Sequence, residues 1–187
     1  MIAAIRNSLL AAGMTCFMLP SFAQRTAITE VHDDIRGVTF YSVQISDDAV
    51  NEWPLVSGEF AESDRVRLGL SALVLDEVAS VEEFVFWIRH EGRRWLSPFN
   101  PQDAVTFLID GESIELEPLR TPQPFVQTGS LVEKIEFNLK AEDLSALLQG
   151  DRVTVVVRTA NGTIQKDFDA TEVMSLARLK ERVEAHS

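Results

Sequence analysis

The chain has 187 residues, which is enough for one domain with a substantial hydrophobic core. Its 29 acidic residues outnumber its 17 basic ones, and the net charge at pH 7 is −12. This excess of negative charge disfavours nucleic acids and anionic membrane surfaces as partners.

The first 23 residues have the pattern of a secretory signal peptide. Arg6 precedes a short apolar run over residues 8–19, and small residues lead to a predicted cut after Ala23. The run is shorter than the ~20 residues that a membrane-spanning helix needs, so a permanent anchor is the weaker alternative. Acylation of Cys16, as in a lipoprotein, is weaker still because the two residues before it are not small. We therefore expect a periplasmic or secreted protein.

Cysteine and histidine are scarce in the rest of the chain. Cys16 is the only cysteine, so the mature domain would have no disulfide, no thiol nucleophile and no cysteine-based zinc site. His32 stands beside Asp33 and Asp34, but one histidine with carboxylates makes a weak metal site. We expect neither a metal nor an organic cofactor.

Residues 24–36 are polar and are predicted to form a flexible N-terminal lead-in. The first strand is expected over Gly37–Ile45, where the apolar residues change parity near Tyr41 and suggest a bulge. A short strand at Leu55-Val56 could follow. A strand is predicted over residues 65–75, whose first half alternates between apolar and polar side chains and so has one buried face. From Leu73 to Leu75 both parities are apolar, so we expect that end of the strand to be covered on both sides.

The next strand is expected over Glu83–Arg89, where Phe84, Phe86 and Ile88 share one parity. Glu91-Gly92 then has the composition of a tight turn, after which a short strand would pair with Glu83–Arg89.

Two β-hairpins are predicted in the C-terminal half. Val105–Leu116 contains Asp110-Gly111, and this pair suits a type I′ turn because both positions need positive φ. Residues 153–168 repeat the layout around Asn161-Gly162. A long proline-containing loop over residues 117–130 separates the first hairpin from the following strand.

Two helices complete the expected elements. Residues 141–149 carry carboxylates in the first turn and a leucine stripe, and Gly150 is a natural stop. Residues 170–184 follow a capping box that Asp169 and Glu172 would form.

These elements predict a mainly β (α+β) fold in one domain over residues 37–187. We expect about eight strands in an antiparallel sandwich or a curled sheet, with a short inserted helix and a C-terminal helix that covers an edge or a face.

The strongest departure from the average composition lies at residues 87–95, where basic and aromatic residues gather in an otherwise acidic chain. Arginines beside tryptophans can bind a carboxylate, a phosphate or a sugar by bidentate hydrogen bonds and stacking. The alternative is an edge strand whose charges prevent aggregation. The candidate binding residues are Trp87, Arg89, His90, Arg93, Arg94 and Trp95.

The sequence contains no serine-nucleophile elbow, paired-histidine zinc motif or phosphate loop. We therefore expect a non-catalytic binding or accessory module, with a protein of the cell envelope or an acidic or glycan ligand as its partner. Two alternatives remain open: a polysaccharide hydrolase that uses two carboxylates, and a purely structural envelope protein.

Overall fold

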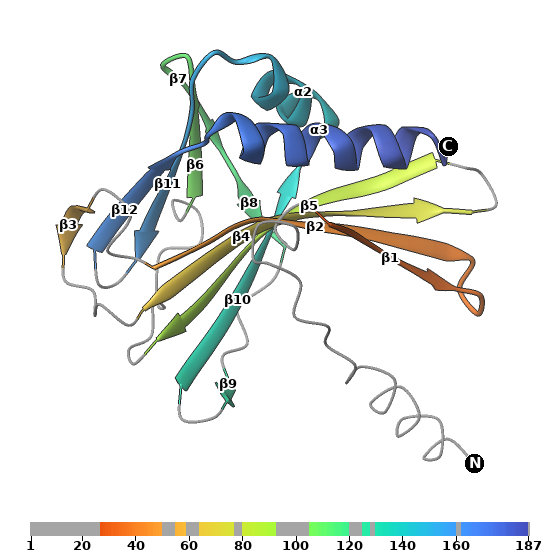
Figure 1. Cartoon of the computed structure of the whole chain (residues 1–187), viewed down its shortest axis with the longest axis horizontal. Helices are drawn as coiled ribbons and strands as arrows, with labels where there is room; N and C mark the ends of the chain where they lie inside the picture. The colour runs from red at the N-terminus through yellow and green to blue at the C-terminus, as the bar shows by residue number, and fades with distance from the viewer. Residues whose placement is uncertain are drawn as a thin grey trace.

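The computed structural model describes residues 27–49, 55–58, 64–76, 80–92, 105–119, 125–127, 130–159 and 162–186. The predicted signal peptide lies outside the described residues, as do Arg93, Arg94 and Trp95. The described chain is mainly β, with two antiparallel sheets and two helices, so the predicted fold class is confirmed (Figure 1).

The larger sheet has seven strands, and neighbouring strands in it are antiparallel. The main path through the sheet runs in the order β1 (Ile28–Asp33), β2 (Val38–Ala49), β4 (Arg65–Leu75), β5 (Ser80–Gly92), β10 (Ser130–Leu139) and β8 (Glu117–Pro118). The seventh strand, β9 (Phe125–Gln127), pairs with β10.

The smaller sheet contains both predicted hairpins. Its order is β3 (Leu55–Gly58), β12 (Gly162–Asp167), β11 (Val153–Thr159), β6 (Val105–Ile109) and β7 (Glu112–Glu115). Asp110 and Gly111 have φ values of 53° and 94°, as the predicted turn between β6 and β7 requires. In the second hairpin Gly162 pairs with Thr159, so this glycine belongs to β12 and not to the turn itself.

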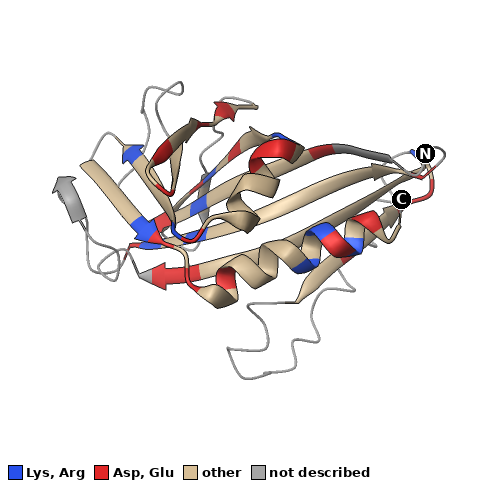
Figure 2. Ribbon diagram, turned by 90° about the horizontal axis from the view of Figure 1, so that it is seen from above, with Lys and Arg blue, Asp and Glu red and all other residues tan. Residues whose placement is uncertain are grey.

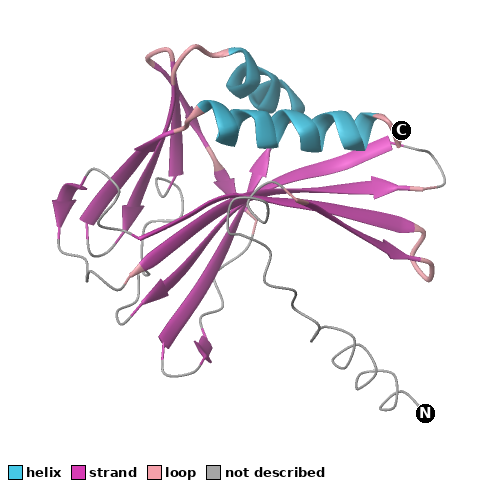
Figure 3. Cartoon of the chain, in the orientation of Figure 1, coloured by secondary structure: helices cyan, strands magenta, loops and turns pink. Residues whose placement is uncertain are grey.

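Both predicted helices form over the predicted residues, as α2 (Ala141–Gln149) and α3 (Ala170–Glu184). Asp169 and Glu172 make the reciprocal capping box at the start of α3. Figure 3 shows the two helices on one side of the molecule. Charged residues alternate along the C-terminal half of α3, which leaves Leu176, Leu179 and Val183 for the core (Figure 2).

The core lies between the two sheets and under α3. Phe86 of the larger sheet meets Phe107 of the smaller one edge to face, with ring centroids 5.0 Å apart. Figure 1 shows α3 and the smaller sheet on the same side of the larger sheet. We call the opposite side of the larger sheet the outer face.

The prediction of a flexible lead-in is wrong for residues 28–33, which form β1 and pair with β2. Most β1 side chains are exposed, so no apolar alternation marks this edge strand in the sequence. Backbone pairing holds it instead. With the other short strands β3, β8 and β9, the described residues contain twelve strands, against the expected eight or so.

The expected bulge in β2 also lies elsewhere. The register shifts between Gln44 and Ser46, and not near Tyr41. Tyr41 therefore keeps the parity of Val43 and is fully buried, while Phe40 points to the outer face and is exposed. Phe40 keeps the parity of Val38, because no register shift lies between these two residues.

The predicted turn at Glu91-Gly92 is wrong as well, because β5 continues through both residues and pairs with β4 and β10 there. Gly92 is required by a close approach. A Cβ atom at this position would lie 2.3 Å from Oδ1 of Asp64 and 2.6 Å from Nε2 of His90.

Candidate binding face

The outer face of the larger sheet carries two chemically different halves, which the strand register places side by side. At one end, cross-strand neighbours are mostly apolar; at the other end they are mostly charged. The rows across β2, β4 and β5 are Phe40–Leu73–Glu83, Ser42–Ser71–Val85, Gln44–Gly69–Trp87 and Asp47–Arg67–Arg89.

The apolar half forms a groove of about 440 Å³, which we call the outer groove. Its apolar lining includes Phe40, Leu73, Val85 and Leu119. Phe40 and Leu119 are each 41% exposed, a large fraction for such side chains. On β1, Val31 pairs with Phe40 and extends the apolar surface to the sheet edge. An exposed apolar patch on a folded domain is a feature of binding surfaces.

Three charged residues also line the outer groove: Glu83, Lys134 and Glu136. Nζ of Lys134 lies 2.8 Å from Oε1 of Glu136, so these two residues form an ion pair. Glu83 has no cationic partner among the described residues. The groove therefore carries one carboxylate that no cation of the described chain neutralises.

The charged half is a network of ion pairs. Asp47 accepts from Nη2 of Arg65 at 2.9 Å and lies 3.1 Å from Nε of Arg67, while Arg67 also reaches Glu91. Burial opposes the ionisation of Asp47, but the hydrogen bond from Arg65 and the charge of Arg67 outweigh it and lower the pKa of Asp47. The cations of this network therefore already have carboxylate partners.

Trp87 separates the two halves. Its ring lies over Gly69 of the neighbouring strand, where a Cβ atom would come within 1.9 Å of Cζ2. Nζ of Lys134 stands 5.4 Å from the ring centroid on this face. Only 9% of Trp87 is exposed, so its faces are occupied by the protein itself.

Three of the six predicted binding residues, Trp87, Arg89 and His90, lie in the part of the chain that the structure describes. Trp87 and Arg89 lie on the outer face beside the groove, whereas His90 has the opposite parity and is buried. His90 therefore does not share a surface with Trp87 and Arg89. Binding by any of the six stays a prediction.

His90 belongs to a buried cluster with two carboxylates. Its Nδ1 lies 3.5 Å from Oε2 of Glu133, and its Nε2 lies 3.9 Å from Oδ2 of Asp64. All three side chains are almost completely buried. Glu133 shares its parity with Ile135 and Phe137, and its opposition to His90 across β10 and β5 could not be predicted from either strand alone.

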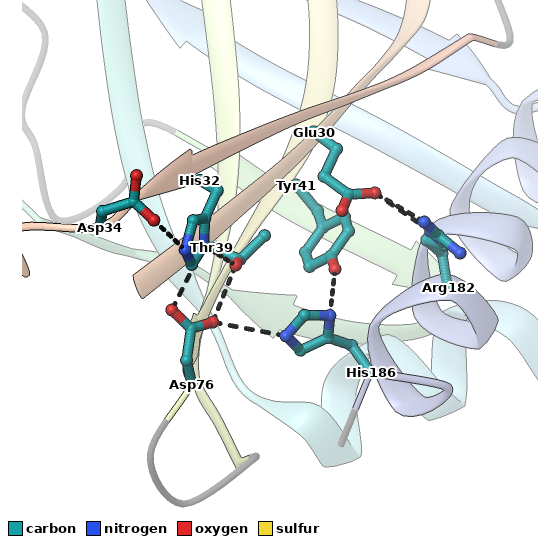
Figure 4. Close-up of polar contacts among 8 residues, drawn as sticks. All are labelled: Glu30, His32, Asp34, Thr39, Tyr41, Asp76, Arg182 and His186. Atoms are coloured by element: carbon teal, nitrogen blue, oxygen red, sulfur yellow. Dashed lines mark hydrogen bonds and ion pairs between the residues drawn. The ribbon is translucent and has the colours of Figure 1, made fainter. Parts of the chain in front are cut away.

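A second polar network lies where β2 begins and β4 ends (Figure 4). Thr39 donates to Asp76 at 2.8 Å, and Nδ1 of His32 lies 2.9 Å from the Thr39 hydroxyl. On the other side of Asp76, Nε2 of His186 lies 3.3 Å away, and Tyr41 contacts the second nitrogen of this ring at 2.7 Å. These contacts join β1, β2, β4 and the end of α3, so the network has a structural role.

Two kinds of feature are not found in the described residues. Within the described ranges, no group of three histidine, cysteine or acidic residues is arranged to hold a metal ion. In the same residues, neither helix is long and apolar enough to cross a membrane.

Comparison with known proteins adds no assignment: no protein family, curated protein or solved structure matches the chain. The outer groove therefore has to be interpreted from its own chemistry.

Proposed function

We propose that this chain is an exported, non-catalytic binding module that holds an apolar segment of a protein partner in the outer groove. The observation that carries the proposal is the exposure of Phe40 and Leu119 around a groove of about 440 Å³. Leaving such side chains in water costs free energy, which a partner that covers them would recover.

The groove favours a protein segment over the other ligand classes that the sequence suggested. A sugar needs an open aromatic face, but Lys134 and Gly69 already cover Trp87. A small acid needs cations with spare hydrogen bonds, and Lys134 and Arg67 already pair with carboxylates. Aliphatic and aromatic side chains of a protein fit the lining that remains.

Export is the second part of this proposal, and the pattern of residues 1–23 supports it. The test is the mass of the protein recovered from the cell envelope or the medium after expression of the whole chain. Cleavage after Ala23 and recovery outside the cytoplasm would agree with the proposal. An uncleaved cytoplasmic product would refute it.

The binding proposal is tested by chemical crosslinking in the producing cells, followed by capture of the protein and identification of what is attached. We compare the natural chain with Phe40→Asp, which places a charge in the groove. The matched control is Met174→Asp, because Met174 is also an exposed apolar side chain but lies on α3.

The expected result is an adduct that Phe40→Asp loses and Met174→Asp keeps. Because Phe40 is exposed, the first variant should keep its midpoint of thermal unfolding within a few degrees of the natural protein. Equal adducts in both variants, or an adduct lost in both, would refute binding through the outer groove.

A further inference from the structure

We infer that the partner segment is extended and carries a lysine or an arginine beside its apolar side chains, with the cation placed against Glu83. This inference rests on the proposed function and adds the chemistry of the partner. It follows from the shape of the outer groove and from the charges that line it.

The residues that line the groove come mainly from β2, β4, β5 and β10, and they extend along β5 from the level of Glu83 to that of Trp87. Glu83 lines one end, Val85 lies in the middle, and Glu136 pairs in register with Trp87 at the other end. Glu83 and Trp87 are four residue steps apart on an extended strand, a length of roughly 13 Å. An extended segment of about five residues would span this distance.

The charges give the segment a direction. At the Trp87 end, Lys134 forms an ion pair with Glu136 and lies over the tryptophan ring, so each of these two charges has a partner within the protein. At the other end, no cation of the described chain pairs with Glu83. A partner cation is therefore favoured at this end only.

The charge of the whole chain acts in the same sense. A net charge of −12 attracts basic segments and repels acidic ones before contact. An acidic segment would also bring a second negative charge next to Glu83 as both lose water, which is unfavourable. The groove thus selects for apolar residues with a basic neighbour.

The test begins with a phage-displayed library of random peptides, selected on protein purified after expression of the whole chain and depleted on Phe40→Asp. We expect the selected peptides to combine apolar residues with lysine or arginine. One selected peptide and its Lys→Gln or Arg→Gln counterpart are then titrated by fluorescence polarisation against three proteins: the natural chain, Glu83→Gln and Glu115→Gln. Glu115 is the matched control, an exposed carboxylate on β7 of the smaller sheet.

Loss of either partner of a partly exposed ion pair should weaken binding about two- to fivefold. The selected peptide should therefore bind Glu83→Gln more weakly by this factor and Glu115→Gln as well as it binds the natural chain. The Gln peptide should bind the natural chain and Glu83→Gln equally, because the pair is then already absent.

Two failures are distinguishable. If selected peptides depend on Phe40 but bind Glu83→Gln unchanged, the cation is wrongly assigned and the binding groove stands. If no peptide distinguishes the natural chain from Phe40→Asp, both this inference and a peptide-binding function for the groove are refuted.

Discussion

The contact between Gly69 and Trp87 gives the sharpest test of the outer face, because a single methyl group should disrupt it. Gly69 lies inside the central strand β4, where glycine is unfavourable unless something approaches closely. The ring of Trp87 is what approaches, at 1.9 Å from where a Cβ atom would lie. In Gly69→Ala the ring must leave its position or the two strands must separate.

The cost can be worked from the burial of Trp87. Insertion of a methyl group into a packed site costs about 1–3 kcal/mol. Displacement of the ring also exposes part of a side chain that is 91% buried, with loss of up to about 2 kcal/mol. We expect Gly69→Ala to lower the free energy of unfolding by about 2–3 kcal/mol, which for this chain length lowers the midpoint of thermal unfolding by roughly 5–10 °C.

The assay is a double-mutant cycle in urea with Gly69→Ala, Trp87→Leu and both changes together. If the ring is the obstacle, Gly69→Ala should destabilise the Trp87→Leu variant by less than about 0.5 kcal/mol. In that background the clash with the ring is gone, and replacement of glycine lowers the conformational entropy of the unfolded chain, which favours folding. An equal loss in both backgrounds would refute the contact as the reason for the glycine.

Two further predictions concern buried and paired charges. Lys166 lies between Asp48 and Glu172 at 2.8 and 3.1 Å, so Lys166→Met should cost about 3 kcal/mol in urea unfolding, because it removes the cation that two buried carboxylates share. Burial raises the pKa of Glu172, so ionisation of this carboxyl destabilises the folded protein as the pH rises. The free energy of unfolding lost in Lys166→Met should therefore be smaller in acid, and a loss independent of pH would contradict this. The pKa of Asp47 is lowered instead, so its contribution is present above the ordinary carboxyl value and is lost as the pH falls through its folded pKa. Asp47→Asn should therefore cost about 1 kcal/mol at pH 7 and less as the pH falls below the ordinary carboxyl value, and a loss independent of pH would contradict the ion pairs as the cause.

The elements that the sequence predicted well are those that local rules specify. Asp110-Gly111 fixes its turn because both positions adopt positive φ, and Asp169 fixes the start of α3 because its carboxylate accepts a backbone N–H within the same turn. Neither depends on a distant part of the chain. Helix and hairpin boundaries could therefore be predicted to within a residue or two.

The outer groove could not be predicted because distant strands build it. Phe40 comes from β2, Val85 from β5 and Leu119 from the segment after β8, and only the strand order makes them neighbours. One signal was present: Leu73 and Val74 are both apolar, which indicated that apolar side chains point to both faces at that end of β4.

The larger sheet departs twice from the usual pattern of buried apolar and exposed polar side chains. It buries the pair of His90 and Glu133, and it exposes the apolar outer groove. The pairing of β5 with β10 links these two features. Burial of ionisable groups costs stability, but it makes one register of β10 against β5 far more favourable than a register shifted by one residue. A slip of β10 by one residue would send Glu133 to the outer face and Lys134 into the core. The native register is also the one that places Lys134 over Trp87 and Glu136 at the end of the groove. The buried His90–Glu133 pair thus favours the register that places Lys134 and Glu136 beside the proposed binding groove.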